Sequence, residues 1–261
     1  MLFRSFMFFS SLPFGMGEED MRKWIGDENW QKSDTLTQAY KYWCALHEPK
    51  GVIPFPFGCS DAQWGGWYKR EPKNIQDFKN WKIRCGGGAA RILMEHLGAK
   101  WSKIPQHDIL SAMASDTLDW VEWISAGEDT KMGLHFLGDK YHLHDESWHE
   151  PFSMLELLVN KTAFDALDTE LKSCFYISLN WVQAESANLV KLGNERAREK
   201  HISGNTKIKT FKFKQELRED LRKETLHVLD SVIAADSIKN PIIKDIYKSY
   251  KKNCTNCELF R

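Results

Sequence analysis

Hydrophobic and polar positions along the first half of the chain predict helices on either side of an extended region. Apolar residues recur at helical spacing within 18–43, within the AARILMEHL segment that follows Gly86–Gly88 and stops at Gly98, and within 107–125. Prolines and glycines divide 49–81 into extended pieces and turns: Pro49, Pro54, Pro56, Pro72, Gly51, Gly58, Gly65 and Gly66.

The second half of the chain combines strand-like and helix-like patterns. Short alternating stretches over 134–148 predict a hairpin that turns at Gly138–Asp139. Helices are predicted over 153–171 and 186–199, with the SCFYISLNW segment between them as a strand. Two more helices are predicted over 214–235 and 242–252, separated by Pro241. No internal repeat is visible.

Charge divides the chain into three parts, although the formal net charge is zero. Residues 1–104 carry 15 Lys and Arg against 11 Asp and Glu, residues 105–190 carry 4 against 15, and residues 191–261 carry 17 against 10. We therefore predict an N-terminal domain (1–104), an acidic α+β middle (105–190) and a basic, mainly helical C-terminal region (191–261). Basic segments are expected to contact nucleic acid.

Composition narrows the compartment and the class of protein. With 261 residues and 42% hydrophobic positions, the chain is long and apolar enough to bury a core. No run approaches the roughly 20 apolar residues of a membrane span, so no membrane partner is expected. The N-terminal MLFRSFMFFSSLPFGMG lacks a signal-peptide cleavage site before Glu18 and is expected to be buried, docked on a partner, or an extension upstream of the natural start. Six irregularly spaced cysteines indicate a reducing, cytoplasmic compartment, with Cys254 and Cys257 in a reduced tail.

Soft ligands in the first segment predict a zinc site. Cys44 and His47 form a C-x2-H pair, and Cys59 and Cys85 follow in and after the Pro/Gly-rich region. Thiolates and an imidazole are the ligands that tetrahedral zinc takes, although a complete zinc finger would show a second C-x2-C where this chain has Cys85 and Gly88. The predicted fold class is therefore α+β and helix-rich, with an N-terminal irregular zinc-finger-like region and a C-terminal helical part.

These motifs resemble a known family. The order C-x2-[CH], then F-G-x-S-D (Phe57 to Asp61), then C-G-x-[CG] opening a helix at Cys85 resembles the zinc-finger region of the large subunits of type IV CRISPR effector complexes, over residues 43–98. The resemblance implies a non-nuclease subunit of a ribonucleoprotein that binds guide RNA and recognises a short duplex motif beside the target DNA. Gly88 stands where the fourth ligand of that family would be.

Basic and aromatic residues alternate between Trp64 and Arg91, as in surfaces that contact phosphates and stack on bases. The basic candidates are Lys69, Arg70, Lys73, Lys79, Lys82, Arg84 and Arg91, beside Trp64, Trp67, Tyr68, Phe78 and Trp81. A second basic stretch, TKIKTFKFK, contributes Lys207, Lys209, Lys212 and Lys214. Buried aromatic residues and a lysine-guarded edge strand are the structural alternatives.

A histidine-rich segment supports an alternative function. His142, His144, Asp145 and His149 could hold a catalytic metal with a carboxylate as general base, which would make the protein a metal-dependent hydrolase or nuclease. A protein-only interaction module is the third hypothesis. Because no nucleophile elbow, Walker loop or dinucleotide fingerprint appears, we predict a non-enzymatic, cytoplasmic nucleic-acid-binding subunit of an antiviral ribonucleoprotein, with zinc as the only expected cofactor.

Overall fold

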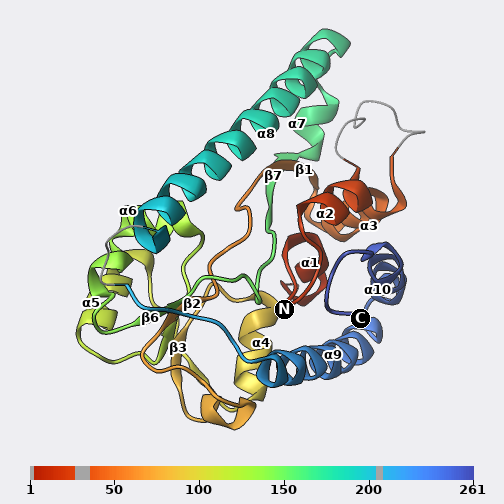
Figure 1. Cartoon of the computed structure of the whole chain (residues 1–261). Coiled ribbons are helices and arrows are strands. Elements are labelled where there is room, and N and C mark those ends of the chain that lie inside the picture. The colour runs from red at the N-terminus through yellow and green to blue at the C-terminus, as the bar shows by residue number, and fades with distance from the viewer. Residues whose placement is uncertain (1–2, 27–35, 204–207) are drawn as a thin grey trace.

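A mixed six-stranded sheet forms one lobe of the computed structural model, which describes residues 3–26, 36–203 and 208–261 (Figure 1). The strand order is β4-β3-β5-β2-β6-β8. Their bounds are β2 Gly66–Tyr68, β3 Lys82–Arg84, β4 Lys100–Trp101, β5 Trp120–Val121, β6 His142–His144 and β8 Thr210–Phe211. Strands β3, β4 and β5 are parallel, and helix α4 (Gly88–His96) provides the crossover that a parallel pair such as β3 and β4 needs.

Helices near both ends of the chain form the other lobe, on the opposite side of the molecule in Figure 1. They are α1 Phe3–Ser10, α2 Glu18–Ile25, α3 Gln38–His47, α9 Gln215–Ser237 and α10 Ile242–Asn253. Short helices α5 (Ile109–Ala114) and α6 (Ala126–Met132) lie against the sheet lobe. Within the ranges described, no helix is long and apolar enough to cross a membrane.

Two long strands and one long helix run between the lobes. Strand β1 (Val52–Cys59) pairs antiparallel with β7 (Met154–Asn160), with a bulge between Pro56 and Gly58. Short helix α7 (Lys161–Asp165) then leads into α8 (Thr169–Arg198), which crosses the upper edge of the molecule. Asp168 caps α8, because its carboxylate accepts the Leu171 N–H at 2.8 Å.

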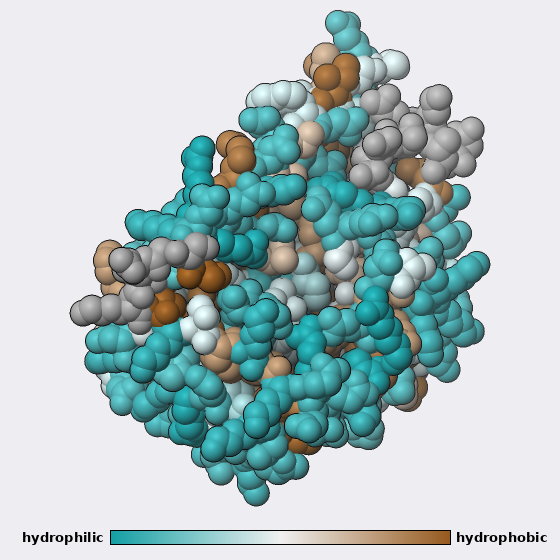
Figure 2. Space-filling view, in the orientation of Figure 1, coloured by the Kyte–Doolittle hydropathy of each residue, from teal (hydrophilic) through white to brown (hydrophobic). Residues whose placement is uncertain are grey.

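Tryptophan fills much of the interior. Within the described ranges, six Trp side chains are fully buried: Trp43, Trp64, Trp67, Trp81, Trp120 and Trp148. The N-terminal segment also packs inside, where Phe9 stacks on Trp24 and Trp43 at ring-centroid distances of 5.1 and 5.6 Å. The surface seen in Figure 2 is mostly polar, with apolar areas at its upper edge.

Several predicted helices are confirmed. The segment after Gly86–Gly88 forms α4, and the two C-terminal helices are α9 and α10. The first predicted helix is present as α2 and α3, with 27–35 outside the described residues. In these segments the apolar spacing and the glycine or proline boundaries are local signals, and they agree with the packing.

Other predicted elements are wrong. Segment 173–181 lies in the first half of α8 and is not a strand, and 154–160 is strand β7 and not a helix. Segment 107–125 is one predicted helix, but its helical part ends with α5, which follows a 3-10 turn at 106–108, and β5 comes next. Segment 134–148 is no hairpin, because β6 pairs with β2 and β8. In each case, contacts with distant segments outweigh local pattern.

The predicted fold class is also wrong. The lobes are α/β, with a mixed sheet that takes strands from all three charge segments. Among the described residues, no group of three or more His, Cys, Asp and Glu side chains could hold a metal, so the zinc-finger-like region is absent there. The boundaries at 104 and 190 stay a prediction.

The cysteines near the C-terminus form a disulfide, Cys254–Cys257, where a reduced tail was predicted. Hydrogen bonds hold this tail against α2: the buried Asp20 carboxylate accepts from Thr255 Oγ1 at 2.9 Å and from the Asn256 N–H at 2.8 Å. The tail is therefore an ordered part of the fold.

Candidate functional site

A turn of three glycines, Gly86–Gly88, lies between β3 and α4 and borders two large cavities. The first has a volume of about 780 Å³, and we call it the acidic cavity. Its charged lining consists of Lys50 and three carboxylates: Glu122, Glu150 and Glu156. The second has a volume of about 850 Å³, and we call it the basic cavity. Its charged lining consists of Glu95 and three basic residues: Arg84, Arg91 and Lys103. Trp123 and Met7 border both cavities.

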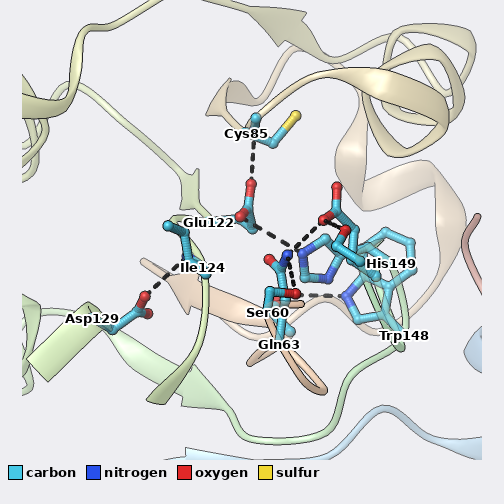
Figure 3. A network of polar contacts seen from close by, with 12 residues as sticks. Ser60, Gln63, Cys85, Glu122, Ile124, Asp129, Trp148 and His149 are labelled. Atoms are coloured by element: carbon cyan, nitrogen blue, oxygen red, sulfur yellow. Dashed lines mark hydrogen bonds and ion pairs between the residues drawn. The ribbon is translucent and has the colours of Figure 1, made fainter. Parts of the chain in front are cut away.

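Two glutamates that line the acidic cavity, Glu122 and Glu150, belong to a network of polar contacts, in which Figure 3 labels Glu122. Glu122 directly follows β5, and its Oε2 accepts the Gly86 N–H at 2.7 Å. Glu150 Oε2 accepts hydrogen bonds from Gln63 Nε2 at 2.6 Å and from Ser153 Oγ at 2.9 Å. Burial, and then repulsion by Glu150, raises the pKa of Glu122, and burial raises the pKa of Glu150. A buried carboxylate beside a partly buried one favours a bound proton or a bound cation.

An amide oxygen completes this acidic group. Gln63 Oε1 is buried and has no hydrogen-bond partner among the described residues. Glu122, Glu150 and Gln63 thus offer hard oxygen donors, which suit Ca²⁺ or Na⁺ better than zinc. Since Ca²⁺ takes about 6–8 oxygen ligands, a ligand carboxylate or water would supply the remainder.

Arg84 joins the two cavities. Its side chain is buried at the end of β3, and Nη1 donates to the backbone oxygen of Glu122 and lies 3.9 Å from Glu122 Oε2. The guanidinium also lies 5.0 Å from the centre of the Trp123 ring. A buried, planar guanidinium beside an open cavity is suited to bidentate binding of a carboxylate.

A buried aspartate fixes the segment that carries Glu122 and Trp123. Asp129 accepts the Trp67 Nε1–H at 2.8 Å and the Ile124 N–H at 3.1 Å. Burial raises the pKa of Asp129 to about 6. Gly66 is required on the neighbouring strand, because it has φ +106° and an added Cβ would lie 2.3 Å from Trp120 Nε1.

The predicted zinc ligands do not form a metal site among the described residues. Cys44 interacts with Tyr40, Cys59 Sγ lies 4.0 Å from Arg22 Nη2, and Cys85 borders the basic cavity. His47 instead approaches Glu156, at 3.3 Å from Nε2 to Oε2. Burial raises the pKa of the thiols of all three cysteines, which disfavours the thiolate that zinc binds.

The predicted nucleic-acid surface has no exposed aromatic platform. Trp64, Trp67, Tyr68, Phe78 and Trp81 are each 1% exposed or less, so they belong to the core. Several basic candidates bind nearby acids: Lys69–Asp116, Arg70–Asp119, Arg91–Glu95 and Lys212–Glu146. Lys73, Lys79 and Lys82 are exposed around β3, while Lys209 and Lys214 flank β8 and Lys207 lies outside the described residues.

The predicted catalytic histidines have separate partners. His142 Nδ1 lies 2.7 Å from Glu71 Oε1, and His144 bonds to Glu146 O through Nδ1 and to the Phe213 N–H through Nε2. His149 is buried, which lowers its pKa to about 3, and its Nε2 lies 4.0 Å from Glu122 Oε1. Asp145 borders a different surface pocket, so these residues form no common metal site.

The sequence matches a known family over most of its length. The model of bacterial extracellular solute-binding protein family 7, DctP, matches residues 2–236. The chain belongs to this family. It is 26% identical over 244 residues to the monocarboxylate 2-oxoacid-binding periplasmic protein of Nostoc sp. PCC 7120, an alignment that covers 94% of this chain and 62% of that protein. The chain therefore spans less than two thirds of the length of this DctP relative.

Solved structures of solute-binding proteins share the fold. One from Colwellia psychrerythraea, with bound calcium and pyruvate, has a TM-score of 0.80 at 23% identity, covering 95% of this chain and 70% of that one. One from Pseudoalteromonas atlantica, with bound sodium and pyruvate, has a TM-score of 0.75 at 24% identity over the same shares. One from Bordetella bronchiseptica, with calcium and picolinate, has a TM-score of 0.78 at 24% identity, covering 96% and 69%. The fold is a two-lobe α/β solute-binding fold.

Membership in the DctP family corrects the functional prediction. The family is extracellular, so the cytoplasmic location and the role in antiviral defence are wrong. The resemblance to a type IV CRISPR subunit is also wrong, together with its guide RNA, target DNA and ribonucleoprotein partners. Neither the hydrolase nor the protein-only alternative agrees with a family that binds solutes.

The sequence pattern includes Arg84 only as one of eleven predicted nucleic-acid-binding residues, and it does not predict Gln63, Glu122 or Trp123 as site residues. One signal was present: Glu122 interrupts the apolar run Trp120-Val121-Glu122-Trp123-Ile124. A charged residue inside a strand-like apolar run is seldom buried without a partner.

Proposed function

We propose that this DctP-family chain binds a small organic acid together with a cation, as the solute-binding component of a membrane transporter. The observation that carries the proposal is the placement of the buried Arg84 guanidinium next to the Glu122 carboxylate at one glycine turn, with Glu150 interacting with Glu122 from the same cavity. A ligand carboxylate would bind Arg84, while the cation would bind the oxygens of Glu122, Glu150 and Gln63 and reduce their repulsion of that carboxylate.

A monocarboxylic 2-oxo acid such as pyruvate is the proposed ligand class. The Nostoc relative is named for binding such acids, and the Colwellia and Pseudoalteromonas structures hold pyruvate with calcium or sodium. The adjacent oxo and carboxylate oxygens of a 2-oxo acid suit a site that combines a guanidinium with a cation. The proposed partner is the membrane permease of a TRAP transporter, in place of the expected absence of a membrane partner.

Calorimetric titration tests the proposal. Pyruvate is added to the purified chain in calcium, in sodium and with a chelator in a buffer free of both cations, and binding is expected only when a cation is present. In Arg84→Met, loss of the charge-assisted hydrogen bonds is expected to weaken binding by at least about 100-fold.

A matched control separates the site from overall charge. Arg70→Met removes the same kind of side chain from an exposed position paired with Asp119, and it is expected to bind pyruvate like the parent. The proposal is overturned if small organic acids fail to bind with either cation, or if both arginine variants bind equally well.

A further inference from the structure

A disulfide closes the first turn of the C-terminal segment, which we define as residues 254–261. This segment runs from α10 toward α1 and α9 (Figure 1). Cys254 and Cys257 form the disulfide, and both are buried. Within the closed turn, Asn256 donates to the Asp20 carboxylate from its backbone N–H at 2.8 Å and from Nδ2 at 3.2 Å. Asp20 is itself buried, so the turn supplies hydrogen bonds that a buried charge requires.

The other end of this segment contacts a residue with a strained backbone. Phe14 has φ +58°, in the left-handed region that a bulky residue adopts only when its surroundings require it. Its backbone oxygen accepts the Leu259 N–H at 2.8 Å, and its N–H donates to the Trp148 oxygen at 2.7 Å. Arg218 adds a third link, because it forms two hydrogen bonds with Glu258 and lies 5.3 Å from the centre of the Phe14 ring. The C-terminal segment thus helps to keep Phe14 in this conformation.

Phe14 connects the C-terminal segment to two walls of the acidic cavity. Ser11 lies three positions before Phe14 and lines that cavity. Trp148, which accepts the Phe14 N–H, lies two positions before Glu150, on another wall. If Phe14 relaxed to an ordinary φ, its N–H would turn away from Trp148 and the segment that carries Glu150 would lose a restraint.

We infer that the C-terminal segment positions Glu150 for binding of the cation and the acid, and that the Cys254–Cys257 disulfide makes this positioning depend on redox state. The inference rests on the proposed function, because it concerns the same site. Disulfides persist in the extracellular compartment of the family, so the oxidised chain is the binding form. A dithiol reductant transfers two electrons and two protons to Cys254 Sγ and Cys257 Sγ, which breaks the S–S bond, and the dithiol becomes a disulfide.

The effect of reduction is expected to be moderate and local. The two cysteines are only three positions apart, so the disulfide restricts the unfolded chain little. Reduction is therefore expected to lower Tm by only about 4 °C, which leaves the chain folded at room temperature. Because the hydrogen bonds to Asp20 and Phe14 become weaker, pyruvate affinity in calcium is expected to fall about fivefold to tenfold.

Calorimetric titration of pyruvate in calcium tests the inference on the oxidised chain, on the chain reduced with dithiothreitol, and after reoxidation. Affinity is expected to fall on reduction and to return on reoxidation. The double variant Cys254→Ser, Cys257→Ser is expected to bind like the reduced chain and to show no response to dithiothreitol. Cys174→Ser, which removes an exposed free thiol, is the matched control and should respond like the parent.

A second pair of variants tests the path through Asp20. Asp20→Asn keeps the disulfide but weakens its contact with the closed turn, so it is expected to lower the affinity of the oxidised chain and to reduce the further effect of dithiothreitol. Glu19→Gln changes the preceding, exposed carboxylate and should behave like the parent. Equal behaviour of the two variants would overturn the path.

Thermodynamic linkage provides a readout that a purely structural disulfide would not change. If reduction weakens binding, then calcium with pyruvate must favour the disulfide by the same factor in buffers of reduced and oxidised dithiothreitol. Equal affinity of the oxidised and reduced chains, or a disulfide equilibrium that ignores the ligands, overturns the inference and leaves the proposed function intact. Failure of the oxidised chain to bind small organic acids overturns the proposed function, and the inference with it.

Discussion

The two cavities beside the triglycine turn are similar in size and differ in charge. The acidic cavity is about 780 Å³ and contains Glu122 and Glu150, and the basic cavity is about 850 Å³ and contains Arg84. Gly87 and Gly88 have positive φ values of +113° and +62°, and no atom lies within 4 Å of an added Cβ at either position. Backbone conformation therefore explains these glycines, and the resulting turn lets opposite charges approach the same point from two sides.

Binding of a ligand in one cavity is expected to depend on the charge in the other cavity. Arg84 and Glu122 are joined through the Glu122 backbone oxygen, so a ligand on one side changes the electrostatic field on the other. A cation among the carboxylates would increase the attraction for a carboxylate ligand at Arg84. The comparison thus predicts that binding of the cation and binding of the acid are coupled, with each increasing the affinity for the other.

The largest expected effect comes from removing charge in the acidic cavity. Glu122→Gln keeps the shape but leaves the buried Arg84 without its neighbouring carboxylate, and loss of one member of a buried pair costs about 3–5 kcal/mol. We expect pyruvate affinity in calcium to fall by at least about 100-fold in calorimetric titrations. Glu95→Gln removes the same charge from the basic cavity and should retain cation-dependent binding. Equal losses in both variants would contradict the assignment of the cation to the acidic cavity.

Protonation of His144 is expected to destabilise the fold at low pH, so the two cavities can be compared only above a certain pH. Burial lowers the pKa of His144 to about 4, and its Nε2 accepts the Phe213 N–H. An unfolded imidazole binds a proton below about pH 6.5 while the folded one does not, so stability is complete above pH 6.5 and is lost as the pH falls toward 4. The expected loss is about 3 kcal/mol.

Urea unfolding at pH 7 and pH 4.5 measures this loss. Carboxylates titrate in the same range, so His144→Gln serves as the reference, and its stability should depend less on pH than that of the parent. If the parent and His144→Gln lose equal stability, His144 is not the group responsible. Binding measurements on the two cavities should therefore be made above pH 6.5.

The spacing of apolar residues in the sequence predicts the helices better than it predicts the candidate binding site. Helices α4, α9 and α10 follow from apolar spacing and from glycine or proline boundaries within each segment. In α8 the CFYISLNW run has the β-branched and aromatic residues typical of a strand, yet packing on β1 and capping by Asp168 make it helical. Segment 154–160 is a strand because β1, nearly 100 positions earlier, supplies its hydrogen bonds.

The site could not be assembled from spacing, because Gln63, Arg84, Glu122 and Glu150 come from four segments that only the folded lobes bring together. The sequence predicts Arg84 as one of several nucleic-acid-binding residues and groups it with exposed lysines. Burial distinguishes them, and burial depends on the whole fold. The sequence leaves open whether the aromatic residues beside them are base platforms or core, and their burial assigns them to the core.

A smaller effect is expected at the amide oxygen of the acidic cavity. Gln63→Met has a similar shape but removes the unpartnered Oε1 and the hydrogen bond to Glu150. One neutral ligand or hydrogen bond contributes about 1 kcal/mol, so calcium affinity in the presence of pyruvate should fall about fivefold to tenfold. Gln106→Met, an exposed glutamine of the basic cavity, is the control and should leave calcium affinity unchanged. Calcium titration monitored by tryptophan fluorescence would reveal the difference, and a parent-like affinity in Gln63→Met would remove this residue from the site.

The smallest expected effect lies in the basic cavity itself. Arg91 is partly exposed, lies 3.6 Å above the Trp101 ring and forms two hydrogen bonds with Glu95, so most of its charge is already neutralised. Because exposed ion pairs contribute about 0–1 kcal/mol, Arg91→Gln should weaken pyruvate binding by no more than about fivefold. A loss as large as that of Arg84→Met would mean that the carboxylate binds deeper in the basic cavity, near α4, and away from the cation. Calorimetry on the two arginine variants side by side therefore locates the ligand carboxylate relative to the turn.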